Sequence, residues 1–170
     1  MELFAANGYR GTSVAAVGRA AGLASSAVHW YFPTKDDLFA AAVRSIFSTA
    51  RDRVEADAGI AGDPRGELVG LLDAVQPYRS LHREAYERMA ESESVRAAYE
   101  EVQRWLEQRL FGAIANRLPE GADVALIADA AHVLFEGILV STRRVDRPIG
   151  ELIDLLTDAL VASAAVKARH

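Results

Sequence analysis

A lysine near the start of a predicted helix has a type and position that indicate recognition chemistry. In the segment PTKDDL, Thr34 suits an N-cap and Asp37, three residues later, completes a capping box. Asp36 and Asp37 suit the positive end of the helix dipole, where a cation is disfavoured. We therefore expect Lys35 to serve a group outside the helix, and a DNA phosphate is the natural candidate. A solvated surface charge is the alternative.

The residues before Lys35 predict a short helix from about Ser25 to Tyr31, with one face left uncovered. Val28 and Phe32 lie four residues apart and should face the core. We expect Trp30, which lies between the two faces, to pack against the protein rather than to read DNA. The outward positions are Ser25, Ser26, Ala27, His29 and part of Tyr31. The two serines could instead only cap the helix, and the histidine could be partly buried.

Two further predicted elements would position this helix. A short apolar helix that includes Leu3 and Phe4 ends at Asn7-Gly8, because both residues tolerate a left-handed backbone, and Tyr9 then turns inward. A second helix begins after Thr12 or Ser13, either of which can cap it. Its buried stripe is expected to be Val14, Val17 and Ala21, and Gly22 and Leu23 form the tight turn that follows. The arrangement is a helix-turn-helix, which presents its second helix to the DNA major groove.

Taken together, LF…NGYRGTSV, the AAGL turn, the YF pair and TKDDL resemble the DNA-binding domain of the tetracycline-repressor (TetR) family of bacterial regulators. The resemblance covers roughly the first 45 residues. It implies a dimeric, ligand-responsive transcriptional repressor that binds an inverted-repeat operator in double-stranded DNA. It also implies phosphate contacts from Thr12, Ser13 and Lys35. The other implied DNA contacts are at base edges from Ser25, Ser26 and Ala27, and at bases or backbone from His29 and Tyr31.

The chain departs from the family pattern in three places. His29 stands where the family usually has Tyr, which introduces an imidazole that can carry charge near neutral pH. Ala24 stands where the family usually has a Ser cap, and a lost cap costs about 1 kcal/mol unless Ser25 takes that role. The family also has two or three more helical turns before Leu3, so we expect the first helix to be truncated.

Composition sets limits on the remaining function classes. The chain has 170 residues, 51% of them hydrophobic, and no cysteine, so disulfides and thiolate metal sites are excluded and a cytoplasmic location fits. No secretory signal is visible, and the longest uncharged stretch, 20–34, is too short to span a membrane. The net charge of −5 divides into +2 over residues 1–35 and −7 over the rest. This asymmetry suits a protein that binds nucleic acid with one end only.

Beyond residue 34 apolar residues recur with a helical period, and no strand pattern stands out. We predict helices at about 34–58, 64–76, 78–90, 95–118, 123–145 and 149–167. The expected fold is therefore all-α. An N-terminal three-helix helix-turn-helix DNA-binding domain would occupy 1–45, and a C-terminal helical ligand-binding and dimerisation domain would occupy 46–170.

The last two predicted helices place small residues among large ones, which lets helices approach closely. We expect them to pair with the same helices of a second chain in a four-helix interface, and the family resemblance implies the same homodimer. Burial within one chain is the alternative. The expected interface residues are Ala128, Ala131, Phe135, Ile138, Leu152, Leu156 and Leu160.

An effector pocket in the C-terminal region would be lined by apolar and aromatic side chains with a few polar groups. The aromatic content hints at a small hydrophobic effector. His132 could be a core histidine, an interface residue or a ligand contact. For each candidate, ordinary core packing is the alternative that side chains of this kind adopt more often than a place in a pocket wall. The candidates are Tyr78, Tyr86, Met89, Tyr99, Trp105, Phe111, His132 and Phe135.

Catalysis finds little support in the sequence. There is no cysteine nucleophile, no glycine-rich phosphate loop and no metal-ligand spacing among the histidines at 29, 82, 132 and 170. We therefore expect no enzyme, no metal and no cofactor. Two other readings stay open: a helical dimer that binds DNA without a small molecule, and a protein-interaction module whose N-terminal unit no longer binds DNA.

Overall fold

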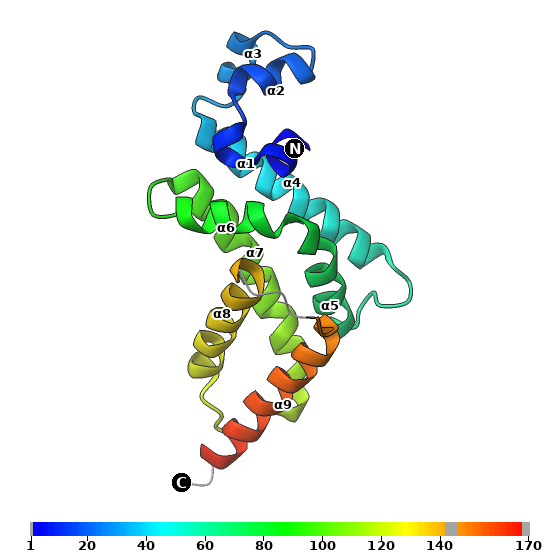
Figure 1. Ribbon diagram of the computed structural model, residues 1–170. Helices are drawn as coiled ribbons and strands as arrows, with labels where there is room; N and C mark the ends of the chain where they lie inside the picture. The colour runs from blue at the N-terminus through cyan, green and yellow to red at the C-terminus, as the bar shows by residue number, and fades with distance from the viewer. Residues whose placement is uncertain (1, 142–145, 168–170) are drawn as a thin grey trace. The chain divides into compact units, whose positions relative to one another are not determined.

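The computed structural model describes residues 2–141 and 146–167, and every regular element in those ranges is a helix (Figure 1). The all-α prediction is confirmed. Short 3-10 turns follow two of the helices, at Gln76–Tyr78 and Ala115–Arg117. The predicted helix end at Val145 lies outside the described residues. The helices are α1 (Glu2–Gly11), α2 (Val14–Ala20), α3 (Ser25–Tyr31), α4 (Lys35–Ala56), α5 (Pro64–Val75), α6 (Arg79–Arg88), α7 (Glu93–Ile114), α8 (Val124–Val140) and α9 (Ile149–Lys167).

Contacts between Cα atoms divide the chain into two compact units. The first joins Met1–Thr49 with Pro77–Val102, and the second joins Ala50–Gln76 with Gln103–His170. Helices α4 and α7 therefore contribute residues to both units. The boundary at residue 45 between a DNA-binding and an effector domain stays a prediction about function.

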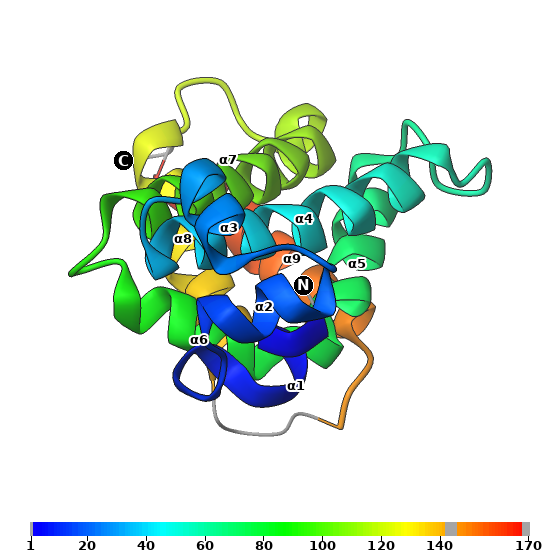
Figure 2. The same ribbon diagram turned by 90° about the horizontal axis from the view of Figure 1, so that it is seen from above.

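In the first unit, aromatic rings hold α1 on α4. The rings of Phe4 and Tyr9 meet the ring of Phe39 edge-on, with centroids 5.2 Å and 5.0 Å apart. Such edge contacts add to the area that the rings bury. Helix α1 also lies beside α6 in both views (Figures 1 and 2). The N-terminal helices are thus anchored on one side by a helix that the sequence places in the C-terminal region.

The long helices keep the apolar periodicity of their sequence. Every member of the α4 stripe is buried, namely Phe39, Val43, Ile46, Phe47, Ala50 and Val54. The stripe of α7 is buried as well: Tyr99, Val102, Leu106, Leu110 and Ile114. The 3.6-residue period therefore identified the core faces of both helices correctly.

In the second unit, α5 starts as its sequence predicts and lies beside α9 (Figure 1). Asp63 is the N-cap and accepts a hydrogen bond from the amide of Arg65, while Pro64 fills the first helical position. The guanidinium of Arg65 then reaches Asp154 of α9 with two bonds of 2.6 Å and 2.7 Å. None of the helices in the described ranges combines the length and apolar character that a membrane span needs.

Candidate nucleic-acid interface

Helices α2 and α3 form the predicted helix-turn-helix. Ser13 rather than Thr12 caps α2, since its hydroxyl accepts the amide hydrogen of Ala16 at 3.1 Å. Gly18 is the buried residue of α2, and a Cβ added there would lie only 3.0 Å from the carbonyl oxygen of Leu23. The glycine therefore lets the turn and α3 approach α2 closely.

The predicted stripe of α2 is partly wrong. Val14 and Val17 are half-buried, but Ala21 is exposed, because the helix is covered at Gly18 instead. A small residue gives no hydrophobic signal in a periodicity pattern, which is why the sequence did not place Gly18 in the stripe.

Helix α3 spans Ser25–Tyr31, as predicted, and leaves most of its side chains uncovered. Val28 is its buried residue, and Ala24 stands at the N-cap without a side-chain hydrogen bond. Ser25 therefore does not replace the missing cap. The outward residues expected from the sequence are placed as follows: Ser25, Ser26, His29 and Tyr31 are exposed, and Ala27 is half-buried.

Trp30 contradicts the expectation that it packs against the protein. Its side chain is 77% exposed, and its ring meets that of Tyr31 edge-on, with centroids 4.7 Å apart. The spacing in the sequence does indicate an outward position for Trp30. It is two residues from buried Val28, and positions two apart on a helix lie roughly 160° apart around the axis. The usual preference of Trp for burial outweighed that signal in our sequence-based expectation.

Thr12 and Ser13 differ in what they can offer to DNA. Ser13 is exposed at the start of α2, whereas Thr12 is 2% exposed and its hydroxyl donates to the carbonyl of Leu3 at 3.0 Å. The Thr12 side chain is thus committed to tying α1 to the turn before α2. Of the two predicted phosphate contacts, Ser13 is the one whose side chain lies on the surface.

The capping box that begins α4 is present in full. The amide of Thr34 donates to the Asp37 carboxylate at 3.0 Å, and the amide of Asp37 donates to the Thr34 hydroxyl at 3.1 Å. The Thr34 hydroxyl also donates to the Asp37 carboxylate at 2.7 Å, and this bond, followed by the one from the Thr34 amide, holds the pKa of Asp37 below its usual value. Lys35 is half-buried with its ammonium 4.3 Å from the centre of the Tyr9 ring. An ammonium has three N–H donors. The Lys35 ammonium can therefore lie on the face of the Tyr9 ring and still donate a hydrogen bond to a phosphate.

Tyr9 is the centre of a charged cluster that links α1, α4 and α6. Its hydroxyl donates to Asp36 at 2.6 Å, and the guanidinium of Arg88 bonds both oxygens of the same carboxylate at 2.5 Å and 2.9 Å. The Arg88 guanidinium also lies 4.6 Å from the Tyr9 ring centre. The hydrogen bonds from Arg88 lower the pKa of Asp36, and the Asp36 carboxylate in turn raises the pKa of Arg88. Burial, followed by the hydrogen bond to Asp36, raises the pKa of Tyr9 to about 12. The three groups keep their charge states at neutral pH.

Glu84 provides a second link from α6 to α1. Gly8 interrupts α1 with φ of 70°, and the amide of Tyr9, the first after the break, donates to the Glu84 carboxylate at 2.5 Å. A carboxylate from another helix thus caps the restarted turn of α1. The sequence predicted the left-handed backbone at Gly8, but it gave no signal for Glu84 or Arg88, whose partners are more than 50 positions away.

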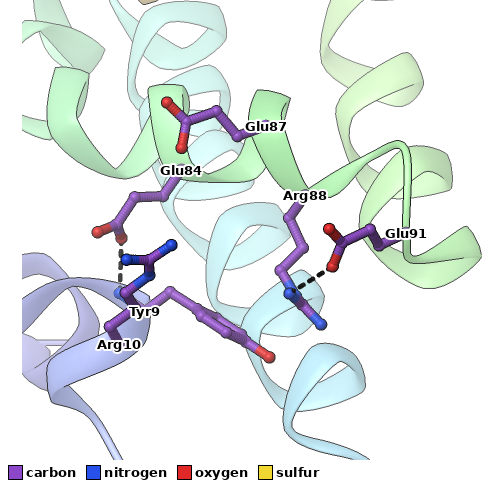
Figure 3. A pocket seen from close by; sticks show the side chains of 6 residues that line it. All are labelled: Tyr9, Arg10, Glu84, Glu87, Arg88 and Glu91. Atoms are coloured by element: carbon purple, nitrogen blue, oxygen red, sulfur yellow. Dashed lines mark hydrogen bonds and ion pairs between the residues drawn. The ribbon is translucent and has the colours of Figure 1, made fainter.

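A polar hollow of about 440 Å³ lies beside these contacts (Figure 3). Its three carboxylates and two guanidiniums come from α1, α6 and the turn after α6. Three carboxylates against two guanidiniums give the hollow a negative balance of charge, which disfavours a phosphate backbone. Its lining residues are Tyr9, Arg10, Glu84, Glu87, Arg88 and Glu91.

The effector candidates do not gather at one described site. Tyr78, Tyr86, Met89 and Tyr99 belong to the first unit, and the other four belong to the second. The rings of Tyr86 and Tyr99 meet with centroids 5.9 Å apart. His132 lies half-exposed between Glu107 and Glu136, 3.3 Å from each, which makes it a surface bridge between α7 and α8.

Sequence reasoning missed His82, which is 1% exposed on α6 and has no hydrogen-bond partner within the described part of the chain for either ring nitrogen. Burial lowers its pKa to about 4, so the ring is neutral at pH 7. No group of three or more metal-binding side chains is assembled among the described residues.

The expected dimer face needs correction. Ala131 and Phe135 are buried within the second unit and line a small apolar gap together with Leu156 and Leu160. A side chain enclosed by its own chain has no surface left for a partner. The large uncovered apolar residues of α8 and α9 lie at other positions: Val124, Leu126, Val133 and Leu155.

The comparisons with known proteins agree with this arrangement. Residues 1–42, which contain α1, α2 and α3, match the family model of bacterial regulatory proteins, tetR family. No curated protein was found to match the sequence. Several solved structures do match in fold.

A transcriptional regulator from Rhodococcus sp. Rha1 has a TM-score of 0.59 at 20% identity, with 96% of this chain and 90% of that chain covered. A TetR/AcrR-family regulator from Thermobifida fusca has a TM-score of 0.55 at 21% identity, covering 94% and 91%. The TetR-family regulator PfmR from Thermus thermophilus has a TM-score of 0.51 at 18% identity, covering 95% and 93%. Likenesses at such low identity establish the shared fold. Residues 1–42 thus match the family model of bacterial regulatory proteins, tetR family, and the chain as a whole shares the fold of these solved regulators.

Proposed function

We propose that this regulator is a dimeric repressor that binds an inverted-repeat operator through α3 and is released by a small hydrophobic effector. Residues 1–45 would bind DNA, and residues 46–170 would bind the effector and the second chain. The cell compartment is then the cytoplasm, where the operator is.

The uncovered face of α3 is the observation that carries the DNA-binding part. Ser25, Ser26 and His29 are exposed, and α3 contains no carboxylate. Hydroxyl and imidazole groups can donate to and accept from base edges in the major groove. Ala27 and Tyr31 belong to the same helix as these three residues. The face therefore offers hydrogen-bonding groups for base readout and has no negative charge that DNA would repel.

Phosphate contacts would fix the helix in the groove. Ser13 is exposed at the N-terminus of α2, where free amides and the helix dipole favour an anion. Lys35 lies in the first turn of α4. Contacts at both places would position α3 without selecting a sequence.

Dimerisation would bring two such helices to one operator. The exposed apolar residues of α8 and α9 support a pairing of these helices with a second chain, and we replace Ala131 and Phe135 in the proposed interface by Val133 and Leu155. A helix-turn-helix dimer reads two half-sites about 34–36 Å apart. A change of that spacing would release the operator.

Effector response would use the contacts of α6. Glu84 and Arg88 join α6 to Tyr9 of α1 and to Asp36 of α4. A ligand that shifts α6 would therefore shift the helices that support α3. It lowers operator affinity only if it prefers the state that does not bind, and the operator must then weaken ligand binding by the same factor.

The test is selection from a random duplex DNA pool with the purified protein. We expect an inverted repeat, and we expect the Lys35→Ala/His29→Ala variant to lose it. No enrichment at low salt would contradict DNA binding and favour a protein-interaction module. With the operator known, compounds can be screened for release; if none releases it, a regulator without a small-molecule effector is the better account.

Single variants separate the two kinds of contact. Lys35→Ala should weaken all DNA sequences about equally and lower the salt slope by about one, whereas His29→Ala should change the preferred sequence. Arg147→Ala is a matched control, because Arg147 forms an exposed ion pair with Glu151 in the other unit. A changed preference in Lys35→Ala alone would show that the assigned roles are wrong.

A further inference from the structure

We propose that Trp30 reads the methyl group of a thymine in the operator, and so determines specificity at one base pair of each half-site. The inference rests on the proposed DNA binding but adds a base contact that neither the motif nor the polar face of α3 includes.

The position of Trp30 on α3 is the first argument. Val28 is the buried residue of this helix, and Trp30 lies two positions beyond it, roughly 160° around the axis. It also follows Ser26 by four residues, which places both side chains on the same outward line. Trp30 is therefore central in the face that α3 would present to DNA.

The exposure of Trp30 is the second argument. It is the most exposed of the large hydrophobic side chains in the described residues, at 77%, followed on the same domain by Tyr31 at 67%. A Trp side chain has roughly 150–250 Å² of surface to bury, at about 25 cal/mol for each Å². An uncovered indole on the recognition helix therefore gains most from a partner that covers it.

Tyr31 orients the indole. The two rings meet at 90° with centroids 4.7 Å apart, the edge-to-face geometry that aromatic pairs prefer. An indole supported in this way meets a partner with less loss of side-chain entropy than a free one. Tyr31 is thus a positioning residue for Trp30.

The chemistry of the groove selects the target. Hydrogen-bond donors and acceptors line the base edges in the major groove, and the apolar exception is the thymine C5-methyl. An indole face matches that methyl. The indole N–H could instead donate to a phosphate, but such a contact would not distinguish thymine from other bases.

The test uses operator duplexes in which each thymine is replaced, one position at a time, by deoxyuridine, which lacks only the methyl. Operator affinity is measured by fluorescence anisotropy for the wild-type chain and for Trp30→Ala. We expect one position in each half-site where deoxyuridine weakens wild-type binding about fourfold, the value of one buried methyl-sized group. Trp30→Ala should bind the parent operator more weakly and should show no further loss at that position.

Two outcomes would overturn the inference. One is an equal deoxyuridine penalty in the wild type and in Trp30→Ala, and the other is the absence of any sensitive thymine while the wild type binds its operator tightly. A wild type that selects no DNA at all would instead overturn the proposed function and this inference with it. Leu23→Ala is the matched control: it shortens another exposed apolar side chain of the same domain and should keep the full deoxyuridine penalty.

Discussion

Arg88 and His82, both on α6, represent opposite ways of placing a basic side chain in a helical protein. Arg88 is charged and satisfied, since both oxygens of Asp36 accept its hydrogen bonds. His82 is enclosed without a partner in the described residues, and its low pKa keeps it neutral. A neutral ring avoids the large cost of a buried charge, but each unpaired polar atom still costs about 1–3 kcal/mol. Removing the Arg88 side chain should therefore lower the free energy of unfolding, whereas replacing His82 by an apolar residue should not lower it.

We expect His82 to make the protein acid-sensitive. Its pKa is about 4 in the folded chain and near 6.5 when unfolded. The unfolded chain thus binds the extra proton first, and the free energy of unfolding should fall by about 3 kcal/mol in all as pH drops from 6.5 to 4. His82→Leu should be at least as stable at pH 7 and should lack this fall. The free energy of unfolding in urea, measured for both proteins between pH 4 and 7, tests this prediction. The other titrating groups are the same in both proteins, so an equal dependence on pH in the two would refute it.

Residue-level predictions from sequence succeeded where the partner is a neighbour in the chain. Thr34 and Asp37 are three apart, so their bonds follow from local geometry alone. The expected packing of Trp30 was wrong, and the Thr12 side chain is buried, because local patterns do not reveal which surfaces the rest of the chain covers. The hydroxyl of Thr12 turns inward to a carbonyl of α1, and Trp30 remains uncovered.

At the scale of elements, helix ends show the clearest agreement between sequence and structure. Ser13, Asp63 and Asp123 each accept an amide from the first turn of their helix. Helix α3 is the exception, since Ala24 at its N-cap offers no acceptor. A recognition helix of seven residues is then held by its packing on α2 rather than by its cap.

Ala24→Ser should stabilise α3. The residue already has the extended backbone of an N-cap, with φ of −65° and ψ of 147°, so a serine hydroxyl can accept an amide of the first turn. We expect the unfolding free energy to rise by about 1 kcal/mol. Thermal unfolding measures this rise. Ala20→Ser, in the last turn of α2, is the control and should give no gain; an equal gain there would show that capping is not the cause.

Gly8→Ala should weaken the attachment of α1 to α6 for two separable reasons. Gly8 has φ of 70° and ψ of 179°, a region that glycine almost alone occupies and that costs an L-residue about 1–3 kcal/mol. A Cβ at Gly8 would also lie 2.6 Å from Oε1 of Glu84. Gly22 has φ of 69° with no atom within 4 Å of its Cβ position, so Gly22→Ala suffers the backbone cost alone. Unfolding of both variants should show the larger loss for Gly8→Ala.

The same experiment in a Glu84→Ala background isolates the contact. There, the loss from Gly8→Ala should shrink to the backbone cost alone, because the carboxylate is gone. Equal losses of unfolding free energy for the two glycine variants in the wild-type background would mean that Glu84 moves aside without cost. The contact between Glu84 and α1 would then contribute little to stability.

At the scale of the whole molecule, most of the large exposed apolar side chains in the described residues lie on two sets of helices. One set is the helix-turn-helix, with Trp30 and Tyr31, and the other is α8 and α9, with Val133 and Leu155. Clustered exposed apolar residues mark interaction surfaces. The proposed division of labour, DNA at one and a second chain at the other, follows from this distribution.

Charges placed on α8 and α9 should separate the dimer. Val133 and Leu155 are 65% and 67% exposed, so Val133→Glu/Leu155→Glu should not disturb the protomer fold. In sedimentation at micromolar concentration, the wild type should have twice the 18.4 kDa of one chain and the variant only that mass. Operator affinity should fall as well, since one half-site is then bound alone. Leu23→Glu, which adds a charge in the helix-turn-helix, is the control for the sedimentation measurement alone and should leave the mass unchanged. A wild type that sediments as a single chain would refute the interface.

The sequence by itself determined which segments are helical, where they begin, and which faces of α4 and α7 are buried, because caps and apolar periodicity act within a few residues. It also contained the helix-turn-helix motif, which is continuous in the chain and matches the tetR family model over residues 1–42. Only the tertiary structure decided that Trp30 is uncovered and that Ala131 and Phe135 face inward. It alone joined Glu84 and Arg88 to Tyr9 and Asp36. The physical reason is that burial and ion pairing depend on which distant surfaces meet, and no local pattern encodes that meeting.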